Sequence, residues 1–331
     1  MNRCYLAASD GIYTYTVSDD GTLSFFDRYP ADRPMYFAFD GGRLFALLCD
    51  PAGDGNSAVL PIWVDDAGLP TDPSPLFSTE GRVGCHLSVT DDVVYAANYS
   101  SGSIARMMLD GSETALLVRE GHSVHPTRQE MPHTHYIAPM PGGTYLAVCD
   151  LGIDSIVVYD RDLERVSVCR VPDGCGPRHL CYSPDGRYAY CANELSSTVS
   201  VLSCDGDRGT FVHLSEMSTR STAYGTADRE ACENYPAAIR CDGRFVYVSN
   251  RGDDDIAVFR IEEDGASLVH VSNLPAGGQW PRDIFVAGDH LIVTNEHSDC
   301  VTVFRMSGDR RTSALPQTIT DLTAPIAVLC V

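Results

Sequence analysis

The sequence predicts an all-β fold, a seven-bladed β-propeller built from four-stranded antiparallel blades. A short apolar strand that ends in Asn or Asp recurs along the chain about every 48 residues, which is a typical length for one propeller blade. No apolar pattern with the 3.6-residue period of a helix persists long enough to indicate a helical repeat protein. No linker divides the chain, so we expect a single propeller domain over residues 1–331.

The second strand of each predicted blade carries the repeat. Each copy is an apolar run that continues through a polar turn into another strand. The regular recurrence of the final Asn or Asp favours a turn-capping role over a metal site, because a hard cation would need more carboxylates. Five copies are clear and two upstream copies are weaker: 94–98, 146–150, 189–193, 246–250, 291–295, then 4–9 and 44–49.

An inner strand precedes each repeat and often begins with proline, as at Pro34, Pro177 and Pro281. Proline suits the first residue of a strand, and the Asp-Gly turns that follow suit tight hairpins. The chain begins with the second strand of a blade at Cys4, and its end, 324–330, reads as an inner strand. We therefore expect the C-terminal strand to pair with the N-terminal strands, which closes the last blade and removes an open sheet edge.

The composition limits the partners. The formal net charge of −21 argues against nucleic acid and against an anionic membrane surface. No apolar run reaches the roughly 20 residues of a membrane-spanning helix, and the N-terminus lacks the pattern of a secretory signal, so we expect a cytoplasmic protein. The 13 cysteines show no C-x-x-C spacing and lie mostly in apolar runs, which indicates reduced core residues. We expect no cofactor, and a monomer or a weak homodimer.

Aligning the blades on their repeats reveals two positions where the chemistry changes. Because the inner and second strands are antiparallel neighbours, both positions should meet at one mouth of the central channel, a usual place for a small ligand. The start of the inner strand reads Met35, Cys85, His135, Arg178, Ala237, Arg282 and Ile326. The residue after the second strand reads Tyr99, Leu151, Glu194, Arg251 and Glu296.

Three of these residues are arginines, which is unusual in so acidic a chain. Guanidinium groups bind carboxylate or phosphate through paired hydrogen bonds, so we expect a small anionic ligand. The alternative is structural: Arg178 and Glu194 would form a salt bridge between strands, and Arg251 and Arg282 would be ordinary surface arginines.

Residues 121–135 contain four histidines. His133 and His135 are two residues apart on a predicted strand and would therefore share a face. Acid–base chemistry by His135, a metal site and structural hydrogen bonding all remain open from the pattern. A third ligand with matching spacing is not evident, so we predict no metal.

Several of these runs resemble one known family. RQEMPHTH (128–135), CGPRHL (175–180), CANEL (191–195) and the strands over 235–259 and 281–304 are similar to the lactonase family of seven-bladed β-propellers. That family includes the propeller type of 6-phosphogluconolactonase and a fungal carboxy-muconate cycloisomerase. The resemblance covers almost the whole chain and implies a lactone hydrolase, most often one that acts on 6-phosphogluconolactone in the pentose phosphate pathway of carbohydrate metabolism.

In the cycloisomerase branch, a His, a Glu and Arg residues at the channel mouth form the proposed catalytic set, which the resemblance places on His135, Glu194, Arg178 and Arg251. Ester hydrolysis needs water as nucleophile, a base and a donor to the developing oxyanion. We predict Arg178 as that donor and His135 or Glu194 as the base, a choice that the sequence leaves open. The predicted substrate-binding residues are Arg251, Arg282, Arg128, Gln129 and His133.

Three alternatives to a 6-phosphogluconolactonase remain. The chain could be another sugar lactonase or a muconate-type cycloisomerase on the same fold, or a non-catalytic propeller that binds a protein partner. An insertion at 219–234 is a candidate cover for the mouth and a candidate determinant of substrate choice.

Overall fold

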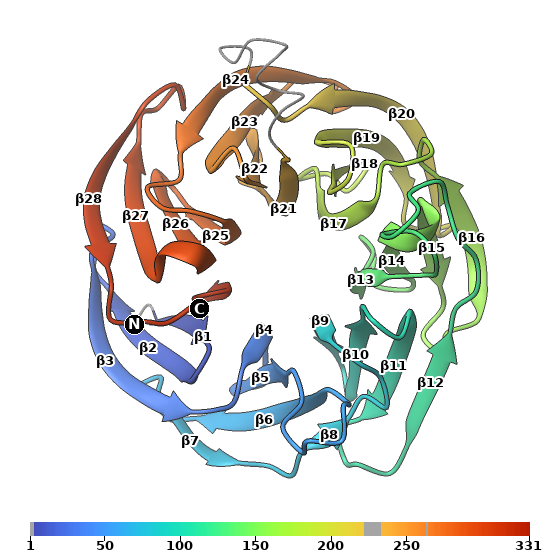
Figure 1. Ribbon diagram of the computed structural model, residues 1–331, viewed down its shortest axis with the longest axis horizontal. Coiled ribbons are helices and arrows are strands. Elements are labelled where there is room, and N and C mark those ends of the chain that lie inside the picture. The colour runs from blue at the N-terminus through green and yellow to red at the C-terminus, as the bar shows by residue number, and fades with distance from the viewer. Residues whose placement is uncertain (1–2, 222–232, 263) are drawn as a thin grey trace.

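The computed structural model describes residues 3–221, 233–262 and 264–331, and it confirms the predicted seven-bladed propeller (Figure 1). Seven antiparallel sheets stand in a ring around a central axis. In six of them the strands follow chain order from the axis outwards, and in the seventh the C-terminal strand takes the inner place. Of the predicted insertion at 219–234, residues 222–232 lie outside the described part.

The blades are numbered by their inner strands. Blade 1 comprises β4 (Pro34–Asp40), β5 (Arg43–Leu48), β6 (Ala58–Val64), β7 (Pro70–Pro73) and the short β8 (Phe77–Ser78), which also pairs with β6. Blade 2 comprises β9 (Gly84–Thr90), β10 (Val93–Asn98), β11 (Ser103–Met108) and β12 (Thr114–Val118). Blade 3 comprises β13 (Thr134–Pro139), β14 (Leu146–Asp150), β15 (Ser155–Tyr159) and β16 (Arg165–Arg170).

Blade 4 comprises β17 (Pro177–Tyr182), β18 (Tyr188–Asn193), β19 (Thr198–Asp205) and β20 (Thr210–Ser218). Blade 5 comprises β21 (Tyr235–Cys241), β22 (Phe245–Arg251), β23 (Asp255–Ile261) and β24 (Leu268–Pro275). Blade 6 comprises β25 (Pro281–Ala287), β26 (His290–Asn295), β27 (Cys300–Met306) and β28 (Ser313–Ile319). Blade 7 comprises β29 (Ala327–Cys330), β1 (Arg3–Ala8), β2 (Gly11–Val17) and β3 (Leu23–Pro30).

The ring closes as the sequence predicted. The C-terminal strand β29 pairs antiparallel with β1, with Cys330 opposite Cys4 and Ala327 opposite Ala7. Figure 1 shows both chain ends within this blade. The pairing gives β1 a partner on each side, so the edge that an unclosed ring would expose is covered.

The hydrophobic core is divided among the interfaces between neighbouring blades. Each of the seven interfaces holds one cluster of buried apolar side chains, drawn mostly from the second and third strands. Three fully buried tyrosines also donate a hydrogen bond to a backbone carbonyl of the next blade, at distances of 2.7–2.9 Å: Tyr5, Tyr95 and Tyr190. These contacts satisfy the phenol group without leaving the apolar interface.

The Asn and Asp that end the second strands are fully buried, and only part of the turn-capping prediction is correct. Asp150 does cap a turn, by accepting a hydrogen bond from the Gly152 N–H at 3.1 Å. Asn193, Asn250 and Asn295 instead donate their amide N–H groups to side chains at the start of the next strand, at 2.7–3.1 Å. Their main role is therefore to connect the second strand to the third.

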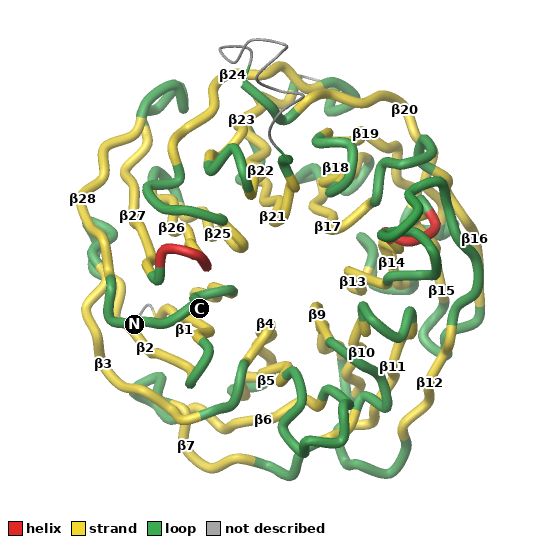
Figure 2. Tube along the Cα trace, viewed as in Figure 1, coloured by secondary structure: helices red, strands yellow, loops and turns green. Residues whose placement is uncertain are grey.

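Two single-turn 3-10 helices follow second strands, η1 (Leu151–Ile153) in blade 3 and η2 (Glu296–Ser298) in blade 6, and they are red in Figure 2. No helix among the described residues is long and apolar enough to cross a membrane.

A β-bulge recurs near the start of the inner strands, at the aligned position where the residue type changes from blade to blade. The strand registers skip the same position in five blades, where the extra residue is Met35, Cys85, His135, Arg178 or Arg282. In blade 5 the skip spans two residues, Ala237 and Ala238. A bulged residue leaves the ladder and its side chain is redirected. Here several of them line one narrow cavity at the channel: Met35, Cys85, Arg178, Arg282 and, from blade 7, Ile326.

Candidate active site

Glu194 lies at the centre of the predicted site. It follows β18 directly, and its backbone N–H donates to the Gly176 carbonyl at 2.8 Å. Its carboxylate contacts three arginines: Arg128 at 2.5 Å, Arg178 at 3.0 Å and Arg251 at 2.7 Å. Burial alone would raise the pKa of Glu194, but the surrounding arginines hold it well below its ordinary value. Glu194 is therefore ionised at neutral pH and fixes the guanidinium groups around it.

Arg178 occupies the bulge of β17 and is almost fully buried. Its Nε donates to Glu194 and its Nη1 donates to the Ala237 carbonyl of blade 5 at 2.9 Å. Burial and the nearby Arg251 lower the pKa of Arg178 to about 10, so the guanidinium stays charged at neutral pH. This is a fixed positive charge at the channel, held away from bulk water.

His135 occupies the equivalent bulge of β13 and is also buried. Its ring lies 5.6 Å from that of Tyr99 and 5.2 Å from that of His179, measured between centroids. Its Nδ1 has no hydrogen-bond partner among the described residues. Burial and the charge of Arg178 lower the pKa of His135 well below its ordinary value, so the imidazole is neutral at neutral pH.

Arg251 and Arg282 lie beside an aromatic group on blade 6. The Arg282 Nη1 donates to Glu296 at 2.9 Å, which is a half-buried ion pair. The Arg251 guanidinium lies 5.5 Å from the centre of the Trp280 ring, within cation–π range. Trp280 in turn stacks on His297, with ring centroids 4.6 Å apart and planes at 11°. The rim of the site therefore combines positive charge with a flat apolar surface.

The histidine-rich segment contributes unequally. Arg128 reaches the site, with its Nη2 3.3 Å from the Tyr99 hydroxyl in addition to its contact with Glu194. Gln129 is fully buried, and its amide donates to the Leu151 carbonyl and accepts from the His125 N–H. The structure therefore places Arg128 at the mouth, whereas both amide atoms of Gln129 are used to fix the segment that carries it.

His133 and His135 do not form a pair of ligands on one strand face. His133 precedes β13, stacks on Tyr99 at 4.5 Å and contacts Glu130 at 3.6 Å, whereas His135 occupies the bulge of β13 with its ring 5.2 Å from that of His179. In the part of the chain that the structure describes, no three His, Cys, Asp or Glu side chains are grouped as metal ligands. His133 reaches the site through its contact with Tyr99.

The cluster carries a surplus of positive charge. Four guanidinium groups, those of Arg128, Arg178, Arg251 and Arg282, are paired with the two carboxylates of Glu194 and Glu296. Arginines in such a position hold planar anions through paired hydrogen bonds, and the surplus charge favours a negatively charged ligand. The salt bridge between Arg178 and Glu194, the structural alternative for these residues, exists but leaves two positive charges unmatched.

Sequence reasoning did not assign a role to the aromatic residues of the rim: Tyr99, Tyr235, Trp280 and His297. One signal was available for Trp280. The residue before the inner strand has a left-handed backbone in several blades, with φ of 65° at Gly176 and 63° at Trp280. Glycine adopts this conformation without strain, whereas tryptophan adopts it at an energetic cost, which favours a function for Trp280 other than forming the turn.

The fold and this cluster define a class, a β-propeller with a group of buried and half-buried arginines at one mouth of its channel. The chain belongs to the lactonase family of seven-bladed β-propellers, because the family model described as "Lactonase, 7-bladed beta-propeller" matches residues 3–331. An uncharacterised protein of Lactococcus lactis subsp. cremoris is 32% identical over 340 residues, which cover 98% of this chain and 95% of the relative.

Solved structures agree with this assignment. A protein from Lactobacillus plantarum is 29% identical with a TM-score of 0.85, and the match covers 100% of both chains. The periplasmic gluconolactonase PpgL of Pseudomonas aeruginosa is 25% identical with a TM-score of 0.88, and the match covers 100% of this chain and 99% of that one.

Proposed function

We propose that this protein is a lactone hydrolase whose substrate is an anionic sugar lactone, with 6-phosphogluconolactone as the first candidate. The observation that carries the proposal is the group of four arginines that share two carboxylates at the channel mouth. Family membership and the similarity to a gluconolactonase support the reaction class. The surplus positive charge supports an anionic group on the substrate.

The proposed roles follow from the environment of each side chain. Arg178 is buried, charged and directed at the channel, so it donates to the oxyanion that forms as water attacks the lactone carbonyl. Arg251, Arg282 and Arg128 hold the anionic group of the substrate, and the ring of Trp280 supports its apolar face.

His135 is the proposed base. The pKa of both candidate bases is lowered, but the Glu194 carboxylate is occupied by three arginines and serves to position them. His135 is neutral and has a free Nδ1 among its described surroundings. Burial and Arg178 lower its pKa, and a bound anion counteracts the charge of Arg178, so substrate binding raises the basicity of His135.

The test is hydrolysis of freshly generated 6-phosphogluconolactone, measured against the spontaneous rate, with D-glucono-δ-lactone as the unphosphorylated control. We expect clear acceleration with the phosphorylated substrate, a smaller effect with the control, and no loss of activity in chelator. Equal rates for the two lactones would contradict the proposal that the arginines recognise an anionic group of the substrate. Loss of activity in chelator would contradict water activation by side chains alone.

If the protein hydrolyses neither lactone faster than the spontaneous rate, the proposal is overturned. That result would favour another lactone, a muconate-type cycloisomerisation or a binding role on the same fold. Localisation in the cytoplasm remains a prediction of the sequence, and fractionation of the source cells would test it.

A further inference from the structure

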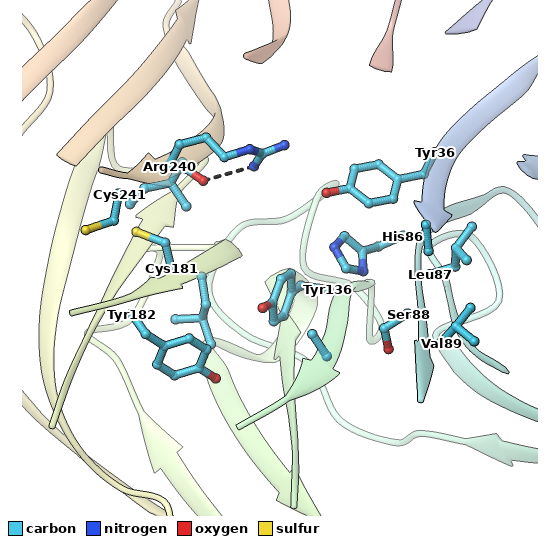
Figure 3. A pocket seen from close by; sticks show the side chains of 14 residues that line it. Tyr36, His86, Leu87, Ser88, Val89, Tyr136, Cys181, Tyr182, Arg240 and Cys241 are labelled. Carbon is cyan, nitrogen blue, oxygen red and sulfur yellow. Dashed lines mark hydrogen bonds between the residues drawn. The ribbon is translucent and has the colours of Figure 1, made fainter. Parts of the chain in front are cut away.

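A second cavity lies at the far ends of the inner strands, away from the arginine cluster. It measures about 450 Å³. Tyr36, His86, Tyr136 and Tyr182 line it together with two cysteines, Cys181 and Cys241 (Figure 3).

The two cysteines come from neighbouring blades. Cys181 lies near the end of β17 and Cys241 is the last residue of β21, so the strands that carry Arg178 and Ala237 at one mouth carry these thiols at the other. Figure 3 shows the two sulfur atoms side by side, and each thiol shifts the pKa of the other. Both side chains are half-buried on the cavity wall. The two thiols therefore lie close together on a cavity that a small reactant can enter.

The environment distinguishes the two thiols. The Cys241 sulfur accepts a hydrogen bond from the Gly243 N–H at 3.3 Å, and the neighbouring Cys181 thiol and this hydrogen bond lower the pKa of Cys241. Burial and the neighbouring Cys241 raise the pKa of Cys181. Two neighbouring thiols, of which one has the lower pKa, are the arrangement of an attacking and a resolving cysteine.

Two other cysteine pairs are in contact, and they differ in access. Cys149 and Cys191 are fully buried between blades 3 and 4. Cys4, opposite Cys330, is also fully buried, and burial raises its pKa well above the ordinary value. Among the described residues, Cys181 and Cys241 thus form the one contacting pair in which both thiols are half-buried on a cavity.

We propose that Cys181 and Cys241 form a redox-active dithiol that a hydroperoxide oxidises to a disulfide between blades 4 and 5. The Cys241 thiolate attacks the outer peroxide oxygen, the O–O bond breaks, and the product is a sulfenic acid plus an alcohol or water. The Cys181 sulfur then attacks the sulfenic sulfur, the S–O bond breaks, and water leaves with the thiol proton. Two thiols are oxidised and one peroxide is reduced. This proposal does not depend on the lactonase activity.

The test is mass spectrometry of the full-length protein after brief treatment with one equivalent of hydrogen peroxide and alkylation of the remaining thiols. We expect the mass to fall by about 2 Da before alkylation, because two hydrogens are lost. Peptide mapping should show a Cys181–Cys241 cross-link that dithiothreitol reverses. The Cys49→Ser variant removes another half-buried cysteine and should form the same cross-link.

Two variants separate the roles of the pair. Cys181→Ser should leave a Cys241 sulfenic acid that dimedone traps, and Cys241→Ser should abolish rapid oxidation at either site. Cys241→Ala should lose rapid oxidation in the same way as Cys241→Ser. Circular dichroism of these two Cys241 variants shows whether the loss of oxidation reflects misfolding. A cross-link at Cys4–Cys330 or Cys149–Cys191 in place of this one would overturn the proposal. So would intact thiols in the wild type, or no trapped sulfenic acid in Cys181→Ser.

Discussion

The Nε of Arg178 lies 3.0 Å from the Oε2 of Glu194, and both side chains are almost fully buried at the channel mouth. The bulge in β17 turns Arg178 to the axis, and Glu194 follows the adjacent strand of the same blade. Since Glu194 also contacts Arg128 and Arg251, one carboxylate orients three cations. Buried like charges oppose folding, so the shared carboxylate of Glu194 is what allows these guanidinium groups to lie together.

Replacement of Arg178 by alanine should remove the oxyanion donor. We expect kcat for the lactone to fall by roughly 100-fold or more, because loss of one such donor costs about 2.7–4 kcal/mol of transition-state stabilisation. The matched control is Arg187→Ala, an exposed arginine in the turn of the same blade, which should retain full activity. Unchanged turnover in Arg178→Ala would exclude Arg178 from the reaction.

Replacement of Glu194 by alanine should destabilise the fold. It leaves three arginines without their shared carboxylate, and loss of one member of a buried ion pair typically costs about 3–5 kcal/mol. Glu296→Ala removes a half-buried carboxylate with one partner and should cost only about 0–1 kcal/mol. Urea denaturation at pH 7 measures both. Equal costs would show that Glu194 is not the central carboxylate of the cluster.

The repeat explains why so much of the site was predictable. The same bulge and the same turn recur in successive blades, so alignment of the blades in the sequence predicts that Arg178, Arg282 and Glu194 lie at one mouth of the channel. Closure of the ring was predictable for the same reason, because the chain starts with a second strand and ends with an inner one.

Side-chain contacts of the loops and turns at the channel mouth were not predictable, because the repeat does not specify them. The amide of Gln129 bonds to the backbone at Leu151 and His125, which no spacing within the segment indicates. The stacking of Trp280 on His297 depends on the left-handed backbone at residue 280 and on the η2 turn. The sequence predicts that the Asn residues at the ends of the second strands cap the turns that follow them. Asn193, Asn250 and Asn295 instead donate hydrogen bonds to side chains five or more residues further along the chain.

Asp255 should make stability depend on pH near neutrality. Burial raises its pKa from 3.8 to about 6, despite hydrogen bonds from Asn250 and Asn273. A carboxyl whose pKa is raised in the folded state contributes stability below its unfolded pKa, and that contribution is lost as the pH rises through about 6. This pKa shift corresponds to a loss of about 3 kcal/mol at most in the free energy of unfolding.

The Asp255→Asn variant tests this dependence. Asparagine keeps an acceptor for the two amide donors but cannot ionise. As the pH is raised from 4.5 to 7.5, the free energy of unfolding of the variant should therefore rise relative to that of the wild type. Chemical denaturation across that range measures the difference. A difference that does not change with pH would contradict the raised pKa of Asp255.

Removal of residues 324–331 should destabilise the protein far more than its length suggests. The deletion removes β29, which leaves β1 without its inner partner and uncovers apolar contacts on both sides of blade 7. We expect a large drop in Tm with loss of a single cooperative transition, measured by circular dichroism and calorimetry. Val331→Ala alters only a half-exposed side chain at the same end and should leave Tm nearly unchanged. A truncated chain with wild-type Tm would show that the closing strand is dispensable.

Trp280→Gly should separate binding from stability. The backbone at Trp280 is left-handed, and this conformation costs a non-glycine residue about 1–2 kcal/mol, so glycine relieves strain while it removes the ring. We expect Tm to change little and KM for the lactone to rise about tenfold, because loss of an aromatic face is worth about 1.5 kcal/mol. Val83→Gly makes the same backbone change in blade 2, where φ is 52°, and should leave KM unaltered. If both variants keep the wild-type KM, Trp280 does not contact the substrate, and its left-handed backbone has a purely structural cause.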